Sequence, residues 1–344
     1  MKKYNFYNDY STGTHPNVLE AIVKFNDEQD AGYGLDKFSN EAREILWDKL
    51  GSKNVDIHFV LNGTQANTIV LSSILRSFEA VIAVSTAHTN VHESGAIEAT
   101  GHKIIDVPSE NGKLTPDLIM EVLANHYGEH MVKPKIVFIS NPTELGTHYT
   151  KKELEKLKGI CKKNNLYLYL DGARLGQALV EKDADLNLSD LPHLVDAFYI
   201  GGTKNGALFG EAVVLINDDF KKDFRNVLKQ RGALLAKGKL IGIQFKTLFE
   251  NDLYFELAKK SKYLADKLRE GITQLSYKFL TDSRTNQLFP IFSNKIIKKL
   301  KKNYGFYVWT KIDLDKSAIR LIISWNTPES AIDNFLSDLK SLSK

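Results

Sequence analysis

The chain has 344 residues, of which 43% are apolar and 26% charged, and its formal net charge is +4. This balance excludes a disordered or fibrous protein, and the length is enough for about two domains with buried cores. The basic residues are spread along the chain, so we expect no nucleic-acid partner. Cys161 is the only cysteine, which excludes an intrachain disulfide and a site with several thiolate ligands.

The sequence shows no sign of membrane insertion or secretion. No apolar run approaches the roughly 18 residues needed to span a bilayer. Residues 1–5 carry two positive charges but are not followed by the apolar stretch of a signal peptide. We therefore expect a cytoplasmic protein with no membrane partner.

From residue 57 to residue 216, short apolar runs alternate with amphipathic stretches. Strands are predicted over 57–61, 81–84, 103–107, 135–140, 166–170, 197–200 and 212–216. Helices are predicted over 65–75, 116–124 and 151–163. Such alternation is typical of an α/β fold, a mostly parallel sheet with helices on both faces.

The pattern changes after about residue 217. Two long helices are predicted there, over 218–234 and 240–275. Strands follow at 287–292, 306–312 and 319–324, and a closing helix begins at Pro328. We therefore expect a large α/β domain over 1–250, including the N-terminal segment, and a smaller α+β domain over 251–344. No Gly/Ser linker separates them, which favours a tight interface.

The first candidate site is the turn that contains Gly63 and Thr64, between a predicted strand and a predicted helix. Gly63 permits a tight turn, and the free N–H groups at the start of the helix suit an anion such as phosphate. The turn matches neither Gly-x-Gly-x-x-Gly nor the ATPase P-loop, which disfavours a dinucleotide or ATP. Taken alone, an ordinary turn with a polar helix cap explains it better.

The second and third candidate sites follow later strands. Asp171 ends an apolar strand, where α/β sheets bind ligands, and Arg174 lies three residues further on. Because the run before Asp171 is apolar, its carboxylate needs a buried partner. Lys204 follows the next strand among glycines, where burial would lower its pKa and leave an amine able to form a Schiff base. A solvent-exposed loop lysine is the ordinary alternative.

Two histidine pairs have helical spacing, His88/His92 and His126/His130. Such a pair can hold a metal from one helix face. Neither pair lies in His-Glu-x-x-His and no third ligand is placed by spacing, so we predict no metal site. A flat ring at His88, after a strand, is better suited to stack on an aromatic ligand.

In this order and spacing, the sites resemble those of fold-type I pyridoxal-phosphate (PLP) enzymes. Within them the chain is similar to the low-specificity threonine aldolases of the β-eliminating lyase group. The lysine follows Asp171 by 204 − 171 = 33 positions, and this pair is the most specific part of the resemblance. The similarity covers residues 8–10, 33–34, 63–67, 87–88, 142–147, 171–174, 203–204 and 320.

The resemblance implies a role for each cofactor-binding residue. Lys204 would bind PLP covalently, with Thr203 beside it. Asp171 would keep the pyridine nitrogen protonated, so that the ring can accept electrons. Gly63 and Thr64 would hold the phosphate through their backbone N–H groups.

It also implies roles on the substrate side. Arg174 would lie near the cofactor's phenolate oxygen and the substrate. His88 would stack on the ring, where it could also take the proton of a substrate hydroxyl. Arg320 matches an arginine that grips the α-carboxylate with two hydrogen bonds. His130 matches a second family histidine, through a loosely aligned segment.

The resemblance implies an oligomer, because enzymes of this group build their sites at a dimer interface. We therefore expect a homodimer or homotetramer in which Tyr33 reaches the neighbouring subunit's site. A Gly-Gly-Gly-Met-Arg run of many relatives is replaced here, and its arginine falls on Leu235. Arg231 and Lys237 are candidates for the cross-subunit phosphate contact that this arginine would make. Asn8 stands where many relatives have a serine, at the substrate site.

The function that the resemblance implies is aldol cleavage. A PLP-dependent aldolase would split L-threonine, L-allo-threonine or a related β-hydroxy amino acid into glycine and an aldehyde. One alternative is another PLP reaction on the same scaffold, such as β-elimination or racemisation. A less favoured alternative is a non-catalytic α/β protein that binds a metal through its histidine pairs.

Overall fold

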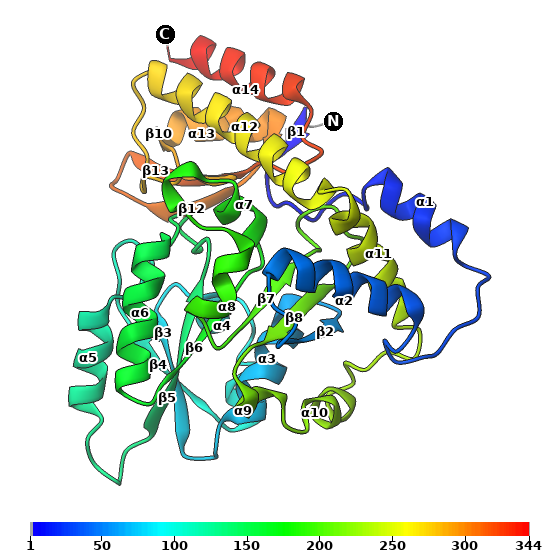
Figure 1. The fold of residues 1–344 in the computed structure, drawn as a ribbon. Helices are drawn as coiled ribbons and strands as arrows, with labels where there is room; N and C mark the ends of the chain where they lie inside the picture. Colours follow the sequence, from blue (N-terminus) through cyan, green and yellow to red (C-terminus); the bar gives the residue numbers. More distant parts are fainter. Residues whose placement is uncertain (1–2, 344) are drawn as a thin grey trace.

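The computed structural model describes residues 3–343, which form a larger and a smaller part (Figure 1). The larger part, at the bottom of Figure 1, contains a broad sheet and most of the helices. The smaller part lies above it and contains the first and the last described elements, β1 (Tyr4–Asn5) and α14 (Glu329–Leu342). Within residues 3–343, no helix is both long enough and apolar enough to cross a bilayer.

The larger part is built on a sheet whose strand order is β2-β8-β7-β6-β5-β3-β4. Neighbouring strands are parallel from β7 to β4, whereas β8 is antiparallel to both β2 and β7. The strands are β2 (Asp56–Val60), β3 (Glu79–Val84), β4 (Lys103–Val107), β5 (Lys133–Ser140), β6 (Tyr167–Asp171), β7 (Ala197–Gly201) and β8 (Glu211–Leu215). Each lies within two residues of the strand predicted for it, because continuous apolar runs define strands that are buried on both faces.

Helices cover this sheet, as the sequence predicted. Every residue of β3, β7 and β8 is buried, which requires cover on both faces. Helix α3 packs on β7 and β8, while α6 packs on β6. The helices are α1 (Pro16–Lys24), α2 (Lys37–Leu50), α3 (Gly63–Ile74), α4 (His88–Val91), α5 (Pro116–Asn125), α6 (Lys151–Lys163), α7 (Leu175–Leu179), α8 (Leu191–Leu194), α9 (Asp218–Lys221), α10 (Phe224–Gln230) and α11 (Lys239–Glu250), with short 3₁₀ turns η1 (Glu98–Thr100), η2 (Lys182–Ala184) and η3 (Leu188–Asp190).

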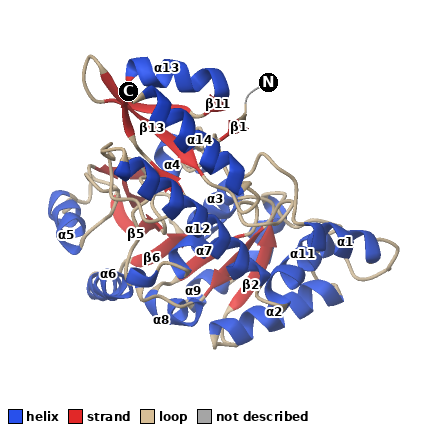
Figure 2. Ribbon diagram, turned by 90° about the horizontal axis from the view of Figure 1, so that it is seen from above, coloured by secondary structure: helices blue, strands red, loops and turns tan. Residues whose placement is uncertain are grey.

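The smaller part is a small sheet covered by helices, visible from above in Figure 2. Strand β13 pairs antiparallel with β9, β10 and β12. The N-terminal β1 pairs in parallel with β11, so the start of the chain joins this part. The elements are β1 (Tyr4–Asn5), α12 (Leu253–Gln274), β9 (Gln287–Leu288), β10 (Ile291–Ser293), α13 (Asn294–Asn303), β11 (Tyr304–Gly305), β12 (Tyr307–Lys311), β13 (Lys316–Ile322) and α14 (Glu329–Leu342).

Each part has its own hydrophobic core. The larger core extends along the chain to Leu257, and the smaller one begins again at Leu264, so α12 contributes to both. Phe6 belongs to the smaller core, together with Phe335. The boundary predicted at residue 250 stays a prediction. Helix α12 is the element that the two cores share, and Phe6 of the N-terminal segment packs in the smaller core.

The two long helices predicted after residue 217 are both broken. Asp223 separates α9 from α10, and Asp252 separates α11 from α12. Both aspartates have left-handed backbone angles, with φ of 55° and 57°, which no helix interior allows. Aspartate tolerates this conformation better than most residues, so the chain turns there.

Helix α13 was not predicted. Only Ile297 and Leu300 are buried in it, and lysines fill most of its other positions. The side chain of Ser293 caps it by accepting a hydrogen bond from Ile296 N at 3.3 Å. Its three apolar residues, Ile296, Ile297 and Leu300, span little more than one turn, which is too short a pattern to indicate a helix.

Candidate active site

Two adjoining cavities lie where the parallel strands β5, β6 and β7 end. One has a volume of about 280 Å³ and is called here the inner part; the other has about 450 Å³ and is called the outer part. The inner part reaches Asp171 on the large sheet, and the outer part reaches Arg320 on the small one. Both parts are lined by Tyr10, His88, Glu144, Arg174 and Lys204, so they form one continuous site.

Asp171 ends β6 and is held by three donors. The Tyr199 hydroxyl and the Ala173 N–H donate to Oδ1 at 2.6 and 2.9 Å, and the Asn67 amide donates to Oδ2 at 3.0 Å. Burial raises the pKa of Tyr199 well above its ordinary value, so its hydroxyl stays protonated and donates. The carboxylate, only 4% exposed, is therefore oriented by the protein alone.

Asn67 connects Asp171 to a second buried carboxylate. Its amide nitrogen also donates to Glu93 Oε1 at 2.8 Å, and its oxygen accepts from the Tyr169 hydroxyl at 3.1 Å. Glu93 Oε1 lies 2.7 Å from His88 Nδ1. Because a carboxylate only accepts, Nδ1 carries a proton, and in the neutral ring Nε2 is the free acceptor. The His88 ring is thus fixed at the edge of the cavity.

Lys204 lies in the turn that follows β7. Gly202 O accepts hydrogen bonds from Asn205 N and Ala207 N, and Gly206 has a φ of +100°, a conformation suited to glycine. Burial and the charge of Arg174 lower the pKa of the Lys204 amine. A lowered pKa leaves more of the amine neutral and able to attack an aldehyde.

Arg174 forms a bidentate ion pair with Asp9. Its Nε and one terminal nitrogen donate to the two carboxylate oxygens at 2.7 and 3.0 Å. Asn286 from the smaller part donates to the same carboxylate at 3.0 Å. Burial by itself would raise the pKa of Asp9, but Arg174 and Lys204 outweigh it and lower this pKa. The pair joins the N-terminal segment to both parts, and it occupies two of the three nitrogens of Arg174.

Arg320 on β13 has no such partner. Its Nε is buried and has no hydrogen bond to any residue in 3–343. The guanidinium carbon lies 4.8 Å from the centre of the Trp309 ring and 5.4 Å from that of Tyr307. Burial and the nearby charge of Arg174 lower the pKa of Arg320, as expected for a cation without a counter-charge. This arginine is ready to bind an anion.

The start of α3 forms one wall of the inner part, together with Thr203. The Asn62 side chain caps the helix by accepting from Gln65 N at 2.9 Å. The N–H groups of Gly63 and Thr64 precede the first intrahelical donor, Ala66 N, and so have no carbonyl partner in the helix. A Cβ on Gly63 would lie only 2.7 Å from the Tyr199 hydroxyl, so this approach needs glycine. The wall is suited to phosphate.

This site can be compared with those of known proteins. A family model described as Beta-eliminating lyase matches residues 5–295. The chain belongs to the β-eliminating lyase family. A solved threonine aldolase from Leishmania major is 44% identical, with a TM-score of 0.98, and the match covers 99% of this chain and 100% of that one. The predicted resemblance to threonine aldolases is confirmed.

Two further relatives show how far the similarity extends. A low-specificity L-threonine aldolase from Pseudomonas sp. (strain NCIMB 10558) is 29% identical over 98% of this chain and 97% of its own length. A Thermus thermophilus aspartate aminotransferase has 15% identity and a TM-score of 0.72, covering 99% of this chain and 91% of that one. The latter match shows the fold alone and confirms the predicted fold type I architecture.

Four residues suggested by the family resemblance lie outside this cavity. His130 is exposed on the segment between α5 and β5, at the amino end of β5, whereas the cavity lies at the carboxyl ends of the strands. The fold therefore does not bring His130 to the site of its own chain. Tyr33, Arg231 and Lys237 are also outside the cavity and exposed, Tyr33 by 43%. Asn8, in contrast, lines the outer part.

The histidine pairs do not form a metal site in the part of the chain that the structure describes. Within residues 3–343, no group of three or more His, Cys, Asp or Glu side chains is arranged to hold a metal ion. The rings of His88 and His92 lie 5.4 Å apart, and both line the outer part of the cavity. Nδ1 of His126 bonds to Val122 O of its own helix at 2.8 Å.

Sequence reasoning missed several members of the site. Asp9, Asn67 and Glu144 lie inside or beside the motifs that carry the family resemblance, but no spacing marks them as ligands. Glu93 and Tyr199 lie outside those motifs. Tyr199 offered one usable signal, because it is a polar hydroxyl within the apolar strand β7, and a buried hydroxyl needs a hydrogen-bond partner.

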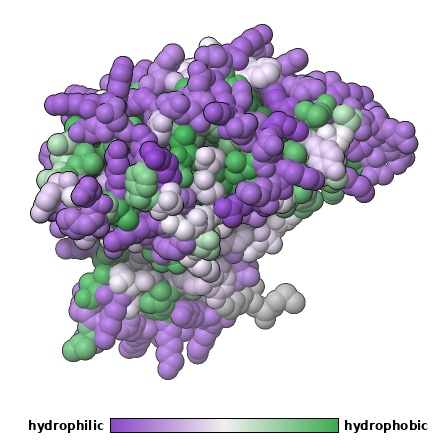
Figure 3. All heavy atoms as spheres, turned by 90° about the horizontal axis from the view of Figure 1, so that it is seen from below, coloured by the Kyte–Doolittle hydropathy of each residue, from purple (hydrophilic) through white to green (hydrophobic). Residues whose placement is uncertain are grey.

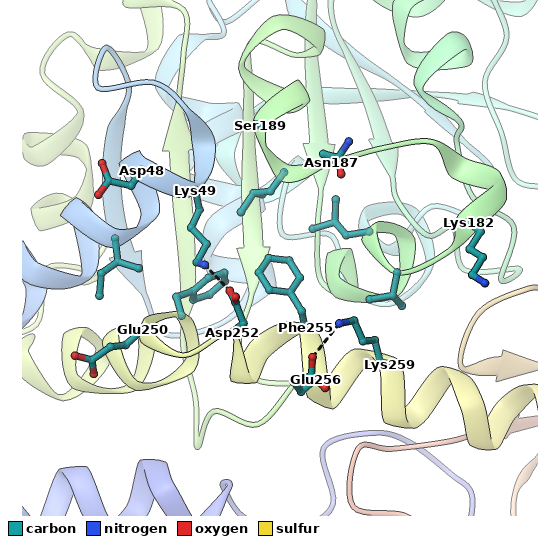
Figure 4. A pocket seen from close by; sticks show the side chains of 15 residues that line it. Asp48, Lys49, Lys182, Asn187, Ser189, Glu250, Asp252, Phe255, Glu256 and Lys259 are labelled. Atoms are coloured by element: carbon teal, nitrogen blue, oxygen red, sulfur yellow. Dashed lines mark hydrogen bonds and ion pairs between the residues drawn. The ribbon is translucent and has the colours of Figure 1, made fainter.

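A cavity of about 940 Å³, larger than the two described above, lies away from them (Figure 4). It opens between α2, the segment 182–189 and the start of α12. Four of its charged side chains form two ion pairs, Lys49 with Asp252 and Lys259 with Glu256. None of the predicted site residues lines it. Volume alone would therefore have located the wrong site.

Proposed function

We propose that the protein is a PLP-dependent threonine aldolase, which cleaves L-threonine or L-allo-threonine to glycine and acetaldehyde. The observation that carries the proposal is the meeting of Lys204, Asp171 and Arg320 around one continuous cavity. These side chains supply an amine for an aldehyde, an oriented carboxylate for a ring nitrogen and a guanidinium for an α-carboxylate. Membership of the β-eliminating lyase family supports the same conclusion.

The residues of the inner part fit PLP. The N–H groups of Gly63 and Thr64, together with Thr203, suit the phosphate, and Lys204 suits the aldehyde. Asp171, held by Tyr199 and Asn67, would keep a proton on the pyridine nitrogen. PLP, when bound, takes up the electron pair that the broken bond leaves on the substrate's Cα.

The residues of the outer part fit an amino-acid substrate. Arg320 would bind the α-carboxylate with two parallel hydrogen bonds, because its Nε has no partner in residues 3–343. His88, fixed by Glu93, would stack on the cofactor ring. Arg174 would stay paired with Asp9 and help to position the cofactor and the substrate. Asn8, which lines the outer part as Arg174 does, would contact the substrate.

We further propose a homodimer or homotetramer with the site near the interface. Helix α1 projects from the body of the molecule in Figure 1 and exposes Leu19 by 52% and Val23 by 68%. Tyr33 N bonds to Ala236 O at 3.3 Å, which places this tyrosine beside Lys237. The face shown in Figure 3 is mostly hydrophilic, with apolar residues in small separate patches, so it is a poorer candidate for this interface.

One assay tests the proposed function against its rivals. The purified holoenzyme is incubated with L-threonine, L-allo-threonine and L-serine, and all products are quantified. We expect glycine and acetaldehyde in equal amounts from the first two substrates. Formation of 2-oxobutanoate and ammonia would instead establish β-elimination, and a D-amino acid would establish racemisation. If the purified protein shows no visible cofactor band, or if borohydride does not abolish that band, the PLP assignment is contradicted.

A further inference from the structure

Glu144 is a carboxyl group in the cavity to which no role has yet been given. It lines both the inner and the outer part, together with His88 and Lys204. Its Oε1 accepts a hydrogen bond from the Ser140 hydroxyl at 2.9 Å. Its Oε2 is buried and has no hydrogen-bond partner among residues 3–343. A buried carboxyl oxygen without a partner is costly, so a bound ligand is the natural partner for it.

The loop that carries Glu144 is held by hydrogen bonds within it and by hydrogen bonds from the smaller part. Within the loop, Thr143 N bonds to Thr147 O at 2.8 Å and Gly146 N bonds to Thr143 O at 3.0 Å. From the smaller part, Gln287 donates to Thr143 O at 3.2 Å and Thr281 donates to Leu145 O at 2.8 Å. These bonds flank Glu144 on both sides, so its side chain is positioned before substrate binds.

The charges around Glu144 suit proton transfer. Burial raises the pKa of Glu144, the carboxylate of Asp171 raises it further, and His88 partly offsets both. Arg174, Lys204, His92 and Arg320 also line the outer part. A carboxyl whose pKa is moved toward neutrality accepts a proton more readily than an ordinary glutamate.

We propose that Glu144 is the catalytic residue that takes the proton from the β-hydroxyl group of the substrate. This inference rests on the proposed aldolase function. The hydroxyl proton moves to Glu144, the oxygen's electron pair forms the C=O bond of the aldehyde, and the Cα–Cβ bond breaks. One proton leaves the hydroxyl and one is added to Cα to make glycine, so atoms and charges balance without another reactant.

Two histidines are the competing acceptors in this cavity. His88 Nδ1 is tied to Glu93, and the ring's proposed task is to stack on the cofactor. His92 lies in the outer part, where burial, His88 and Arg320 lower its pKa and weaken it as a base. His88 and Glu144 both line the two parts of the cavity, but the unpartnered oxygen of Glu144 belongs to a side chain with no proposed contact with the cofactor ring.

The test compares two reactions of the holoenzyme. Threonine cleavage needs a base for the β-hydroxyl, whereas exchange of the α-hydrogen of glycine with deuterated solvent does not. In Glu144→Gln, which can keep the Ser140 bond, we expect kcat for threonine cleavage to fall by roughly 100- to 10,000-fold. Glycine exchange, followed by proton NMR, should stay within a few-fold of the wild type, and the visible cofactor band should be unchanged.

Three control variants accompany it. Glu79→Gln changes another buried glutamate, at the amino end of β3, and should leave both reactions unchanged. Glu144→Asp keeps an acid with a shorter reach and should recover part of the cleavage that Glu144→Gln loses. His92→Phe should reduce cleavage much less than Glu144→Gln does.

Several results would overturn the inference. Near-normal cleavage by Glu144→Gln would exclude Glu144 as the base, and loss of cleavage in His92→Phe alone would assign the base to His92. If both Glu144→Gln and Glu144→Asp lose threonine cleavage, glycine exchange and the cofactor band to the same extent, Glu144 has a structural role and is not the base. If the wild type cleaves no β-hydroxy amino acid, the proposed function fails. If the wild type cleaves threonine and Glu144→Gln does so nearly as fast, only this inference fails.

Discussion

Asp171 in the inner part of the cavity and Arg320 in the outer part are both charged and largely enclosed, but they differ in their partners. Asp171 receives hydrogen bonds from Tyr199, Asn67 and Ala173 N. Arg320 has a buried Nε without a partner in residues 3–343 and is held only between aromatic rings. The hydrogen bonds of Asp171 are complete as built, whereas Arg320 leaves hydrogen-bonding groups for a ligand.

This difference matches the two kinds of molecule that the site would bind. A resident cofactor needs a rigid frame, because the position of its ring decides which substrate bond breaks. A substrate that enters and leaves at each turnover needs groups whose pairing is completed only on binding. The unpartnered oxygen of Glu144, which lines both parts, is such a group, because its hydrogen bonding would be completed only when substrate binds.

The largest effect is expected from Lys204→Ala. This change removes the amine that would hold PLP, so both the visible cofactor band and threonine cleavage should be lost completely. The band is measured by absorbance, and mass spectrometry of the borohydride-reduced wild type locates the modified residue. Cofactor attached to any other lysine would show that the inner part has been assigned wrongly.

Asp171→Asn should come next. A neutral amide cannot stabilise a protonated pyridine nitrogen, so we expect kcat to fall by roughly 100- to 1000-fold. The new NH₂ group would also face donors that now bond to the carboxylate. Cofactor content, from absorbance, should decrease only modestly.

A matched variant separates charge from hydrogen bonding at this position. Tyr199→Phe removes one donor to Asp171 but leaves its negative charge. Its kcat should fall much less than that of Asp171→Asn. Equal losses in the two variants would mean that the orientation of Asp171, and not its charge, limits the reaction.

The sequence predicts the two parts of the cavity unequally well. The strands that end at Asp171 and before Lys204 are continuous apolar runs, so their positions and the end of the sheet that carries the site follow from pattern alone. The family resemblance then assigns roles to the candidate residues at that end of the sheet. The short strands of the smaller part carry exposed and half-buried residues, as in β12, and give a much weaker signal.

Pairings between distant residues are beyond such a pattern. Asp9 and Arg174 are 165 positions apart, and nothing local to either predicts the other. The role predicted for His130 stays a prediction: its alignment with a family histidine lies in a loosely matched segment, and the fold places that segment at the amino end of β5. Glu144 lies at the carboxyl end of the same strand, where the chemistry occurs.

The next prediction concerns Arg320, the residue in the comparison whose side chain lacks a hydrogen-bond partner in residues 3–343. In Arg320→Ala, loss of a charge-assisted bidentate contact should cost on the order of 2–4 kcal/mol, so kcat/KM for threonine should fall by roughly 30- to 1000-fold. Arg320→Lys should recover little, because an ammonium cannot reproduce the planar fork. Cofactor content should stay normal in both variants. Full kcat/KM in Arg320→Ala would remove this residue as the carboxylate anchor.

The smallest effect is expected from the aromatic platform under Arg320. Trp309 lies 4.8 Å from the guanidinium carbon, and a cation–π contact of this kind contributes about 0.5–2 kcal/mol, depending on how far it is desolvated. Trp309→Leu should therefore lower kcat/KM by roughly 2- to 30-fold, mainly through KM, because the arginine remains but is held less firmly. Trp309→Phe keeps an aromatic face and should lose less. If Trp309→Leu lowers kcat/KM as much as Arg320→Ala does, the tryptophan contacts the substrate itself and the guanidinium is not the main element of recognition.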